Sequence, residues 1–403
     1  MKRGSDRIER VKAALRDANL DALVCTLPEN VLLLTGYWPV VGTAIAVAAA
    51  GGDVWLLAPE DEHNLALFGW ADTVRPYAPG SLTRLTSPAE AAQPPLTTLL
   101  REAGLGAARI GYESSSGFEG AGYAAIYLFG DALAGVLRSA APDADLHPAG
   151  ASLARLRSAL TPAEVDKVRL GCSVAKAAFE TAAKTLGVGR AESEVAADLA
   201  GRLSVLGLAS SGVQRAGGFA YCMSGANSAR AGAAYARSTA REPRDGDFIL
   251  VHCNSYIDGY WTDITRTYVV GGPDERQRSM YEAVFAARHA ALSALRPGVR
   301  ASEVDKAARD VLTDRGFGPN FTHGLGHNVG FSVISTEYPP RLHPASHDLL
   351  EVGMTFNLEP AIYIAGFGGL RHCDVVTLGP SGAEVLSPFH ARLEELVLAH
   401  AVQ

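Results

Sequence analysis

Apolar positions along the first 150 residues switch between helical and strand-like spacing. Residues 7–19 have the spacing of an amphipathic helix, and the apolar run 22–26 predicts a strand directly after it. Further strands are predicted at residues 44–50, 54–58 and 109–112. Pro94-Pro95 and the glycines at 104 and 106 predict surface loops. Strands that alternate with helices in this way are typical of an α/β domain.

A helix start marks the second half of the chain. Thr161-Pro-Ala-Glu164 places a capping residue, a proline in the first turn and a glutamate that completes a capping box. We therefore expect a helix from Thr161, with apolar residues following at helical spacing, and a domain boundary shortly before it.

The pattern of two helices followed by a hairpin occurs twice after that boundary. A second helix is predicted at 192–206, and the strands 248–251 and 263–270 flank the turn signal Asp258-Gly259. The repeat consists of helices at 279–295 and 303–314 and strands at 355–358 and 374–378. We expect two domains, α/β over residues 1–155 and α+β over 156–403, as 403 residues allow.

Composition and charge exclude several classes of partner. The net charge of −7 is modest and spread out, which argues against a nucleic-acid partner. The N-terminus has no apolar signal-peptide core, and the longest apolar stretch, near 40–52, is too short to cross a membrane. Five irregularly spaced cysteines give no disulfide framework, so we expect a reduced, cytoplasmic protein.

Three candidate metal ligands lie in separate glycine-containing motifs. Asp263 lies in the segment 259–267, His327 in Phe321-Thr-His-Gly-Leu-Gly-His-Asn-Val-Gly330, and Glu359 in Gly353-Met-Thr-Phe-Asn-Leu-Glu-Pro360. One imidazole and two carboxylates form a ligand set that suits Mn, Fe or Zn. A fourth motif, Gly369-Leu-Arg-His-Cys-Asp374, follows.

The order and spacing of these motifs resemble the pita-bread metallopeptidases, which comprise the methionine aminopeptidases, aminopeptidase P and the prolidases. The prolidase and aminopeptidase P branch is the most similar. Pro28-Glu-Asn-Val-Leu-Leu-Leu-Thr-Gly36 also resembles the signature of the creatinase/prolidase N-terminal domain. The resemblance covers most of the chain, and it implies a pita-bread domain after the α/β domain.

The resemblance implies five ligands for two divalent metals, and this chain keeps three of them. Asp263, His327 and Glu359 match the family's second Asp, its His and its first Glu. His252 stands at the position of the first Asp, eleven residues before Asp263, and Cys373 stands at the position of the last Glu. The family's catalytic histidines are also replaced, one by Ile334 and another, in a gapped alignment, by Tyr235.

These replacements leave the metal content open. Cys373 removes a bridging carboxylate, and a thiolate prefers softer ions such as Zn, while His252 offers one nitrogen in place of two oxygens. We expect at most one tightly bound divalent metal, Zn or Mn, held by Asp263, His327 and Glu359 with Cys373 or His252. The alternative is a site without metal, in which Cys373 is a buried apolar side chain and His252 only forms hydrogen bonds.

The resemblance also implies residues that act on substrate. His323, His327 and Glu359 are candidate catalytic groups, and His323 and Arg371 match family positions that contact substrate or the carboxylates around the metals. Asp258, Glu337 and His343 have only loop context, so we interpret them as solvated polar residues.

The expected function is hydrolysis of C–N bonds in small peptides or peptide-like compounds, related to that of the Xaa-Pro dipeptidases. Two alternatives stay open: a metal-independent hydrolase of the creatinase type, and a catalytically inactive homologue that binds a peptide or protein partner. The resemblance to the prolidase branch implies a homodimer.

Overall fold

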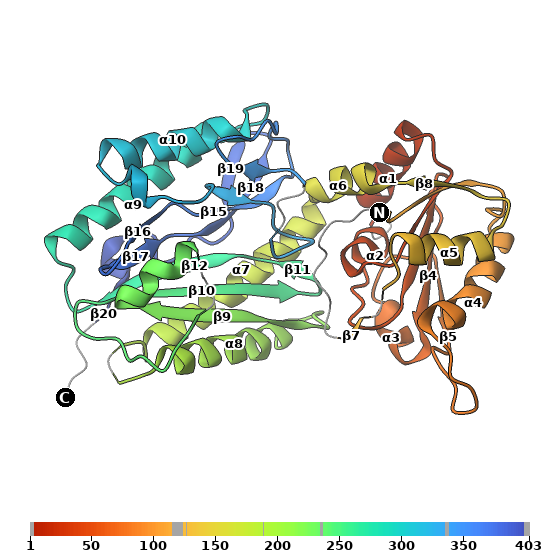
Figure 1. Ribbon diagram of the computed structural model, residues 1–403, viewed down its shortest axis with the longest axis horizontal. Coiled ribbons are helices and arrows are strands. Elements are labelled where there is room, and N and C mark those ends of the chain that lie inside the picture. The colour runs from red at the N-terminus through yellow and green to blue at the C-terminus, as the bar shows by residue number, and fades with distance from the viewer. Residues whose placement is uncertain are drawn as a thin grey trace. The chain divides into compact units, whose positions relative to one another are not determined.

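The computed structural model describes residues 4–114, 124–125, 127–187, 189–233, 237–334 and 338–398. The chain divides into two compact units between Arg157 and Ser158 (Figure 1). Tyr235 and Glu337 lie outside the described residues. Within the described part of the chain, no helix has both the length and the apolar character that a membrane crossing requires.

The N-terminal unit is built on a six-stranded mixed sheet in the order β5-β4-β3-β1-β6-β8. Strand β3 pairs antiparallel with β1 and β4, and the remaining pairs are parallel. The strands are β1 (Ala22–Cys25), β3 (Ile45–Ala49), β4 (Val54–Pro59), β5 (Thr73–Tyr77), β6 (Arg109–Tyr112) and β8 (Asp145–Pro148), with β2 (Val41–Gly42) and β7 (Ala124–Ala125) forming a separate pair. The helices are α1 (Ser5–Asp17), α2 (Pro28–Thr35), η1 (Glu60–Glu62), α3 (His63–Ala66), α4 (Pro88–Glu102), α5 (Asp131–Ala140) and α6 (Gly150–Ser158).

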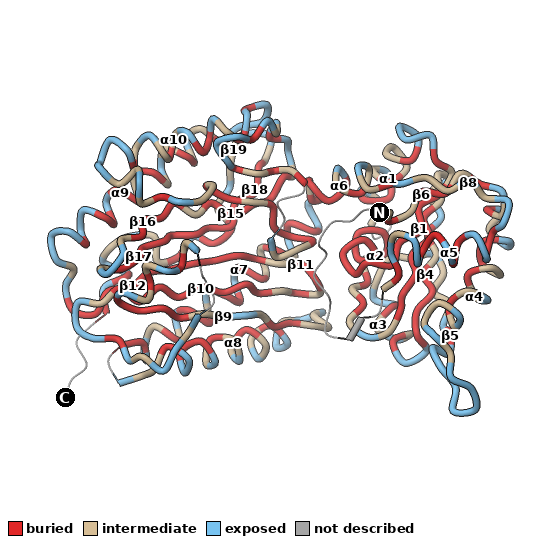
Figure 2. Tube along the Cα trace, viewed as in Figure 1, coloured by how far each residue is buried: buried red, intermediate tan, exposed pale blue. Residues whose placement is uncertain are grey.

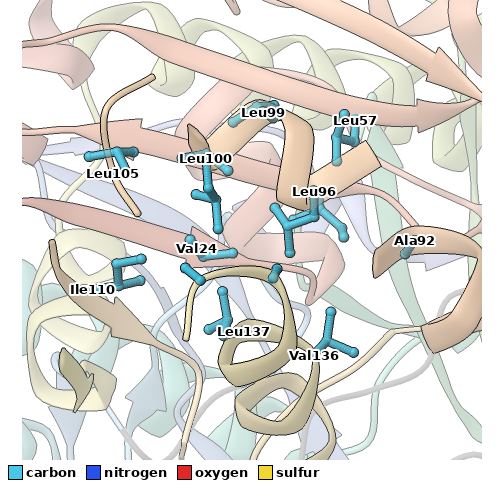
Figure 3. Close-up of a cluster of buried hydrophobic side chains, with 14 of the residues drawn as sticks. Val24, Leu57, Ala92, Leu96, Leu99, Leu100, Leu105, Ile110, Val136 and Leu137 are labelled. Atoms are coloured by element: carbon cyan, nitrogen blue, oxygen red, sulfur yellow. The ribbon is translucent and has the colours of Figure 1, made fainter. Parts of the chain in front are cut away.

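The core of this unit lies between the sheet and the helices α4 and α5 (Figure 3). Leu96 and Leu100 of α4 and Leu137 of α5 point toward Val24 and Ile110 of the sheet, and all five side chains are buried. The α/β class predicted from the alternating pattern is therefore confirmed.

The predicted loop at Pro94-Pro95 is wrong, because both prolines lie inside α4. Each proline removes one backbone N–H donor from the helix. The helix persists because Ser87 and Glu90 form a capping box at its start and because its apolar face packs on the sheet. The packing of this apolar face therefore outweighs the local cost of the two prolines, which alone would favour a loop.

The C-terminal unit contains a five-stranded sheet with the path β11-β10-β12-β20 and with β9 paired to the other edge of β10. The strands of this sheet are β9 (Ala216–Ser224), β10 (Phe248–Ile257), β11 (Tyr260–Trp261), β12 (Ile264–Val270) and β20 (Val397–Leu398). β10 and β12 are buried along most of their length (Figure 2). Asp258 and Gly259 both have positive φ in the tight turn between β10 and β11, as the turn signal predicted.

Helices α7 (Pro162–Ala183) and α8 (Glu192–Leu208) pack on one face of this sheet (Figure 1). The predicted capping box at the start of α7 is confirmed: Thr161 N donates to Glu164 at 2.7 Å, and Thr161 Oγ1 accepts from Glu164 N. The opposite face of the sheet carries His252, which lies across from Tyr221 on β9 and Thr265 on β12.

The second repeat supplies the rest of the unit. Helices α9 (Glu275–Ala294) and α10 (Ala301–Asp314) follow the first hairpin, as predicted. The short elements after them are η3 (Gly318–Asn320), β13 (Gly326–His327), β14 (Arg341–Leu342), β15 (Thr355–Leu358), β16 (Ala361–Ile364), β17 (Gly368–Arg371), β18 (Asp374–Gly379), β19 (Gly382–Val385) and η4 (Leu393–Glu395), and η2 (Gly225–Gly232) follows β9. An isolated bridge between Thr265 and Cys373 joins the two repeats, and this bridge brings the fourth motif beside Asp263.

Candidate functional site

Three motif residues from different elements converge at one point. Asp263 precedes β12, Glu359 follows β15, and Cys373 lies between β17 and β18. One ligand atom from each lies within 4.8 Å of the others, so the three side chains form a group able to hold a metal ion. Asp263 and Cys373 are buried, whereas Glu359 is partly exposed.

His327 faces the same point. Its Nε2 lies 3.6 Å from Asp263 Oδ2. Its Nδ1 lies 3.0 Å from the carbonyl oxygen of Asn328, which assigns the proton to Nδ1. Nε2 then accepts a hydrogen bond from Asn357 Nδ2 at 3.0 Å. A metal ion that binds Nε2 would replace this hydrogen bond.

His252 is held by neighbouring side chains through both ring nitrogens. Nδ1 lies 2.8 Å from Thr265 Oγ1 and 3.2 Å from Arg371 Nη2, and Nε2 lies 3.0 Å from Asn254 Oδ1. A guanidinium only donates, so Nδ1 is the acceptor and Nε2–H donates to Asn254. Burial lowers the pKa of His252, which favours this neutral form.

Cys373 is part of the same cluster as a thiol. Its Sγ lies 3.3 Å from Asp263 Oδ1 and 3.3 Å from the Asp263 carbonyl oxygen. Burial, reinforced by the charges of Asp263 and Glu359, raises the pKa of this thiol well above its ordinary value. A metal ion that binds Cys373 therefore has to displace the thiol proton.

Arg371 supplies a permanent positive charge beside these groups. Its Nε donates to Thr265 Oγ1 at 3.0 Å, and its Nη1 lies 3.7 Å from Glu359 Oε2. Burial alone would raise the pKa of Asp263, but the charge of Arg371 and the hydrogen bond from Cys373 hold it below the ordinary value.

A cleft of about 680 Å³ opens beside this cluster. His323, His327 and Glu359 line it, so the candidate catalytic groups share one cavity. His323 Nε2 lies 3.1 Å from the Tyr363 hydroxyl, and its ring is tilted against that of Tyr363. Ile334, at the position of a family histidine, does not line this cleft and is 40% exposed.

The cleft also contains residues that the sequence analysis did not place in a site. Arg341, His343 and His347 form part of its lining, although His343 had been interpreted only as a solvated loop residue. Arg341 is held by Asp348 through two hydrogen bonds, of 2.8 and 2.5 Å. The spacing His-x-x-x-His of His343 and His347 can be read from the sequence, but it does not indicate that their loop faces the cleft.

Asp258 has the structural role that its loop context suggested. Its carboxylate accepts from the backbone N–H groups of Gln214 and Arg215 and from Lys167 Nζ. It therefore fixes the tight turn to the start of β9, away from the site.

Among the described residues, the donor set around Asp263 fits one metal ion. Asp263, Glu359 and Cys373 form a compact group with His327 Nε2 next to it, as a four-coordinate soft site requires. His252 is outside this group, and both of its nitrogens are already hydrogen-bonded. The assignment of individual ligands stays a prediction.

Comparisons with known proteins identify both units. Residues 166–380 match the model of metallopeptidase family M24, and residues 7–159 match the creatinase/prolidase N-terminal domain. Xaa-Pro dipeptidases from Pyrococcus furiosus and Lactobacillus helveticus are 33% identical over 232 residues and 34% identical over 226 residues. The aligned parts cover 58% and 55% of this chain, and only 64% and 58% of those relatives.

Solved structures match over nearly the whole chain. The Xaa-Pro dipeptidase from Bacillus anthracis has a TM-score of 0.77 at 22% identity and covers 98% of this chain and 99% of its own. A dipeptidase from Mycobacterium ulcerans has a TM-score of 0.73 at 26% identity, with 98% of both chains covered. The C-terminal unit thus has the pita-bread fold and follows a creatinase/prolidase N-terminal domain in the sequence, and the chain belongs to metallopeptidase family M24.

Proposed function

We propose that this protein hydrolyses C–N bonds in small peptides or peptide-like compounds, as a relative of the Xaa-Pro dipeptidases with at most one tightly bound divalent metal. One observation carries the proposal: Asp263, Glu359 and Cys373 remain in a compact group at the edge of a cleft. The cleft has the size and the mixed polar lining of a small-molecule site.

Asp263, Glu359, Cys373 and His327 would hold the ion. A divalent ion in such a site supplies Lewis acidity and lowers the pKa of water. Zn²⁺ suits the sulfur ligand better than Mn²⁺ does.

The remaining steps belong to side chains that face the cleft. Glu359 would take a proton from the attacking water and return it to the leaving nitrogen, and its position in the lining of the cleft supports this role. His323 lines the cleft as a hydrogen-bond acceptor: its Nδ1–H donates to the Gly324 carbonyl oxygen at 2.7 Å, which leaves Nε2 to accept from the Tyr363 hydroxyl or from a substrate N–H. Arg371 provides a fixed positive charge next to the Glu359 carboxylate.

A metal-independent hydrolase of the creatinase type is the second candidate, and Arg371 supports it. The buried guanidinium already provides a positive charge next to Glu359 and His252. Acid–base work would then fall to His327 and Glu359, which both line the cleft.

Turnover with and without metal tests both proposals. The purified protein is assayed for hydrolysis of Ala-Pro, Gly-Pro and a panel of amidines, with added Zn²⁺ or Mn²⁺ and after treatment with EDTA. Loss of hydrolysis on chelation supports the first candidate, and retained hydrolysis supports the second. No hydrolysis under any condition by folded protein contradicts both and favours an inactive homologue that binds peptides. Glu359→Gln is the control for activity from contaminants.

We also propose a cytoplasmic homodimer. All five cysteines are buried free thiols, which supports a reducing compartment. Light scattering of the purified protein tests the dimer, and a monomeric mass would contradict it.

A further inference from the structure

Three buried side chains form a hydrogen-bonded row beside the candidate metal ligands. Asn254 Oδ1 lies 3.0 Å from His252 Nε2, and His252 Nδ1 lies 3.2 Å from Arg371 Nη2. The other terminal nitrogen of the guanidinium, Arg371 Nη1, lies 3.7 Å from Glu359 Oε2. We call Asn254, His252 and Arg371 the Asn-His-Arg row.

The row borders Asp263. Side chains of β10 alternate between the two faces of the sheet, so His252 and Asn254 share one face. His252 pairs with Thr265 of β12 and Cys253 pairs with Ile264, so the next step of this register brings Asn254 across from Asp263. His252 Nδ1 lies 3.7 Å from Asp263 Oδ1. The row therefore lies where the family resemblance implies the first metal-binding aspartate.

Arg371 fixes the direction of every hydrogen bond in the row. A guanidinium has only donors, so His252 Nδ1 accepts and the ring proton lies on Nε2. Nε2–H then donates to Asn254 Oδ1. Turning the Asn254 amide over would set two donors against each other, so the orientation of the amide is fixed as well.

Two further side chains hold the His252 ring. Arg371 Nε donates to Thr265 Oγ1 at 3.0 Å, and this hydroxyl lies 2.8 Å from His252 Nδ1. The hydroxyl can accept from Arg371 and donate its single hydrogen to His252. Tyr221 stacks on the ring, with centroids 5.8 Å apart and an interplanar angle of 7°. The imidazole is thus held at both nitrogens and on one face.

A metal ion would have to break the row in order to bind His252. At Nδ1 the ion would replace two hydrogen bonds and would lie next to the permanent positive charge of Arg371. At Nε2 it would have to replace the proton that Asn254 accepts. The row therefore makes His252 a poor metal ligand at either nitrogen.

The Asn254 side chain has one hydrogen bond among the described residues, and it goes to His252. Its Nδ2 is buried there without a partner. A buried donor without a partner costs stability, so the amide does not owe its place to a set of satisfied hydrogen bonds. Its contact with the imidazole points instead to a role in orienting His252.

We infer that the Asn-His-Arg row takes the place of a second metal ion at this site. Arg371 supplies the positive charge next to Glu359, and Asn254 is a positioning residue that keeps His252 as an acceptor for Arg371. This inference deepens the proposed function, and it rests on that function only for the use of Glu359 in hydrolysis. The positive charge beside Glu359 is then part of the polypeptide and stays in place when a chelator removes metal ions.

Nitrogen NMR of protein with isotopically labelled histidine, prepared without metal, tests the direction of the row. The signals of His252 are those that disappear in His252→Gln. We expect a protonated Nε2 and an unprotonated Nδ1, and the opposite result overturns the inference.

Variants of Asn254 test its positioning role by the same spectrum. Asn254→Leu removes the acceptor, so His252 should show both proton positions. Asn254→Asp keeps an acceptor of the same shape and should keep the proton on Nε2. A folded Asn254→Leu variant with the same single proton position as the parent overturns the role of Asn254.

Addition of Zn²⁺, up to two ions per chain, tests the exclusion of metal from His252. The His252 signals should not shift in the parent, and they should shift in Arg371→Met, where Nδ1 has lost its cation. Arg371→Lys keeps a positive charge and should behave like the parent. The matched control is Arg169→Met, which removes an exposed arginine paired with Glu384 in the same unit and should also behave like the parent.

A zinc-induced shift of His252 in the parent overturns the inference, and so does a folded Arg371→Met variant in which zinc leaves His252 unchanged. None of these signals depends on turnover. Absence of hydrolysis by the folded protein, together with the expected spectra, would contradict the proposed function and leave the row standing.

Discussion

Arg371 Nη2 lies 3.2 Å from Nδ1 of His252, at the position where the family resemblance implies a metal-binding carboxylate. The guanidinium can only donate, so the lone pair of His252 Nδ1 is directed at a cation that belongs to the protein. Two carboxylates of the family's five-ligand set are absent. The two negative charges that they would carry equal in size the positive charge of one divalent ion. The geometry and the charge therefore both support a site with room for one metal at most.

Restoring both carboxylates should restore affinity for a hard ion. In the double variant His252→Asp, Cys373→Glu, Asp263, His327 and Glu359 would be joined by the two missing oxygen ligands, so Mn²⁺ should bind more tightly than in the parent. Each single change should help less than the pair, because ligands of one site act as a unit. Calorimetric titration with Mn²⁺ measures the effect.

A control for this experiment is His343→Asp, which adds a carboxylate to the cleft away from the ligand group. It should leave Mn²⁺ affinity near that of the parent. A folded double variant that binds Mn²⁺ no better than the parent would show that residues 252 and 373 do not serve a common metal.

Turnover of Xaa-Pro dipeptides should lie far below that of an intact prolidase. Ile334 cannot transfer a proton where the family has histidine, and such groups contribute roughly 10²–10⁴-fold. Ile334→His should raise the rate constant kcat for Ala-Pro, and Ile334→Leu should not. Rapid Mn²⁺-stimulated cleavage by the unmodified protein would contradict the assignment of Ile334.

Arg266 of the Asp-Ile-Thr-Arg-Thr motif should be required for stability. It is fully buried, its Nη2 lies 2.7 Å from Asp374 Oδ1, and it also donates to the carbonyl oxygens of Ser387 and Phe389. Arg266→Met leaves Asp374 with Arg288 as its remaining arginine partner and should lower the free energy of unfolding by about 3–5 kcal/mol. Urea unfolding measures this loss.

The comparison variant is Lys306→Met, which breaks an exposed pair with Asp310 and should cost less than about 1 kcal/mol. Equal effects of the two substitutions would mean that the buried pair does not stabilise the fold.

His372 should make stability depend on pH. Burial, followed by the charge of Arg266, lowers the pKa of His372 to about 4. The unfolded chain takes up this proton near pH 6.5, whereas the folded protein does not. The free energy of unfolding should therefore fall as the pH drops from 6.5 toward 4, by about 2 kcal/mol between pH 7 and 5 from this residue.

His372→Leu should flatten that pH dependence, as measured by urea unfolding at pH 7 and pH 5. His289→Gln, at an exposed position, should leave it unchanged. The same slope in His372→Leu and in the parent would exclude His372 as its source.

The sequence predicted most elements because local and tertiary preferences agree in them. The capping box at Thr161 and the helical apolar face after it predicted α7, and the Asp258-Gly259 turn predicted the β10–β11 corner. The pattern failed in α4, where buried leucines hold Pro94 and Pro95 in a helix. β9 was also missed, because its glycines and small residues hide the alternation and its pairing with β10 lies outside the local pattern.

The spacing of the sequence motifs predicted only part of the site. Motif order indicated Asp263, Glu359 and Cys373, and the structure brings them together. Spacing does not reveal that Thr265, Asn254 and Arg371 occupy the nitrogens of His252, because these contacts depend on strand register and on the bridge between Thr265 and Cys373. Nor does it show that the loop with His343 and His347 faces the cleft.

The metal content of the protein, purified without added metal or chelator, tests the central claim most directly. Plasma emission on a sample of known concentration gives the number of divalent ions per chain. We expect between zero and one divalent ion per chain, with zinc favoured over manganese. The candidate ligands are Asp263, Glu359, Cys373 and His327, because His252 is hydrogen-bonded to Arg371. Two ions per chain at near full occupancy would contradict the account.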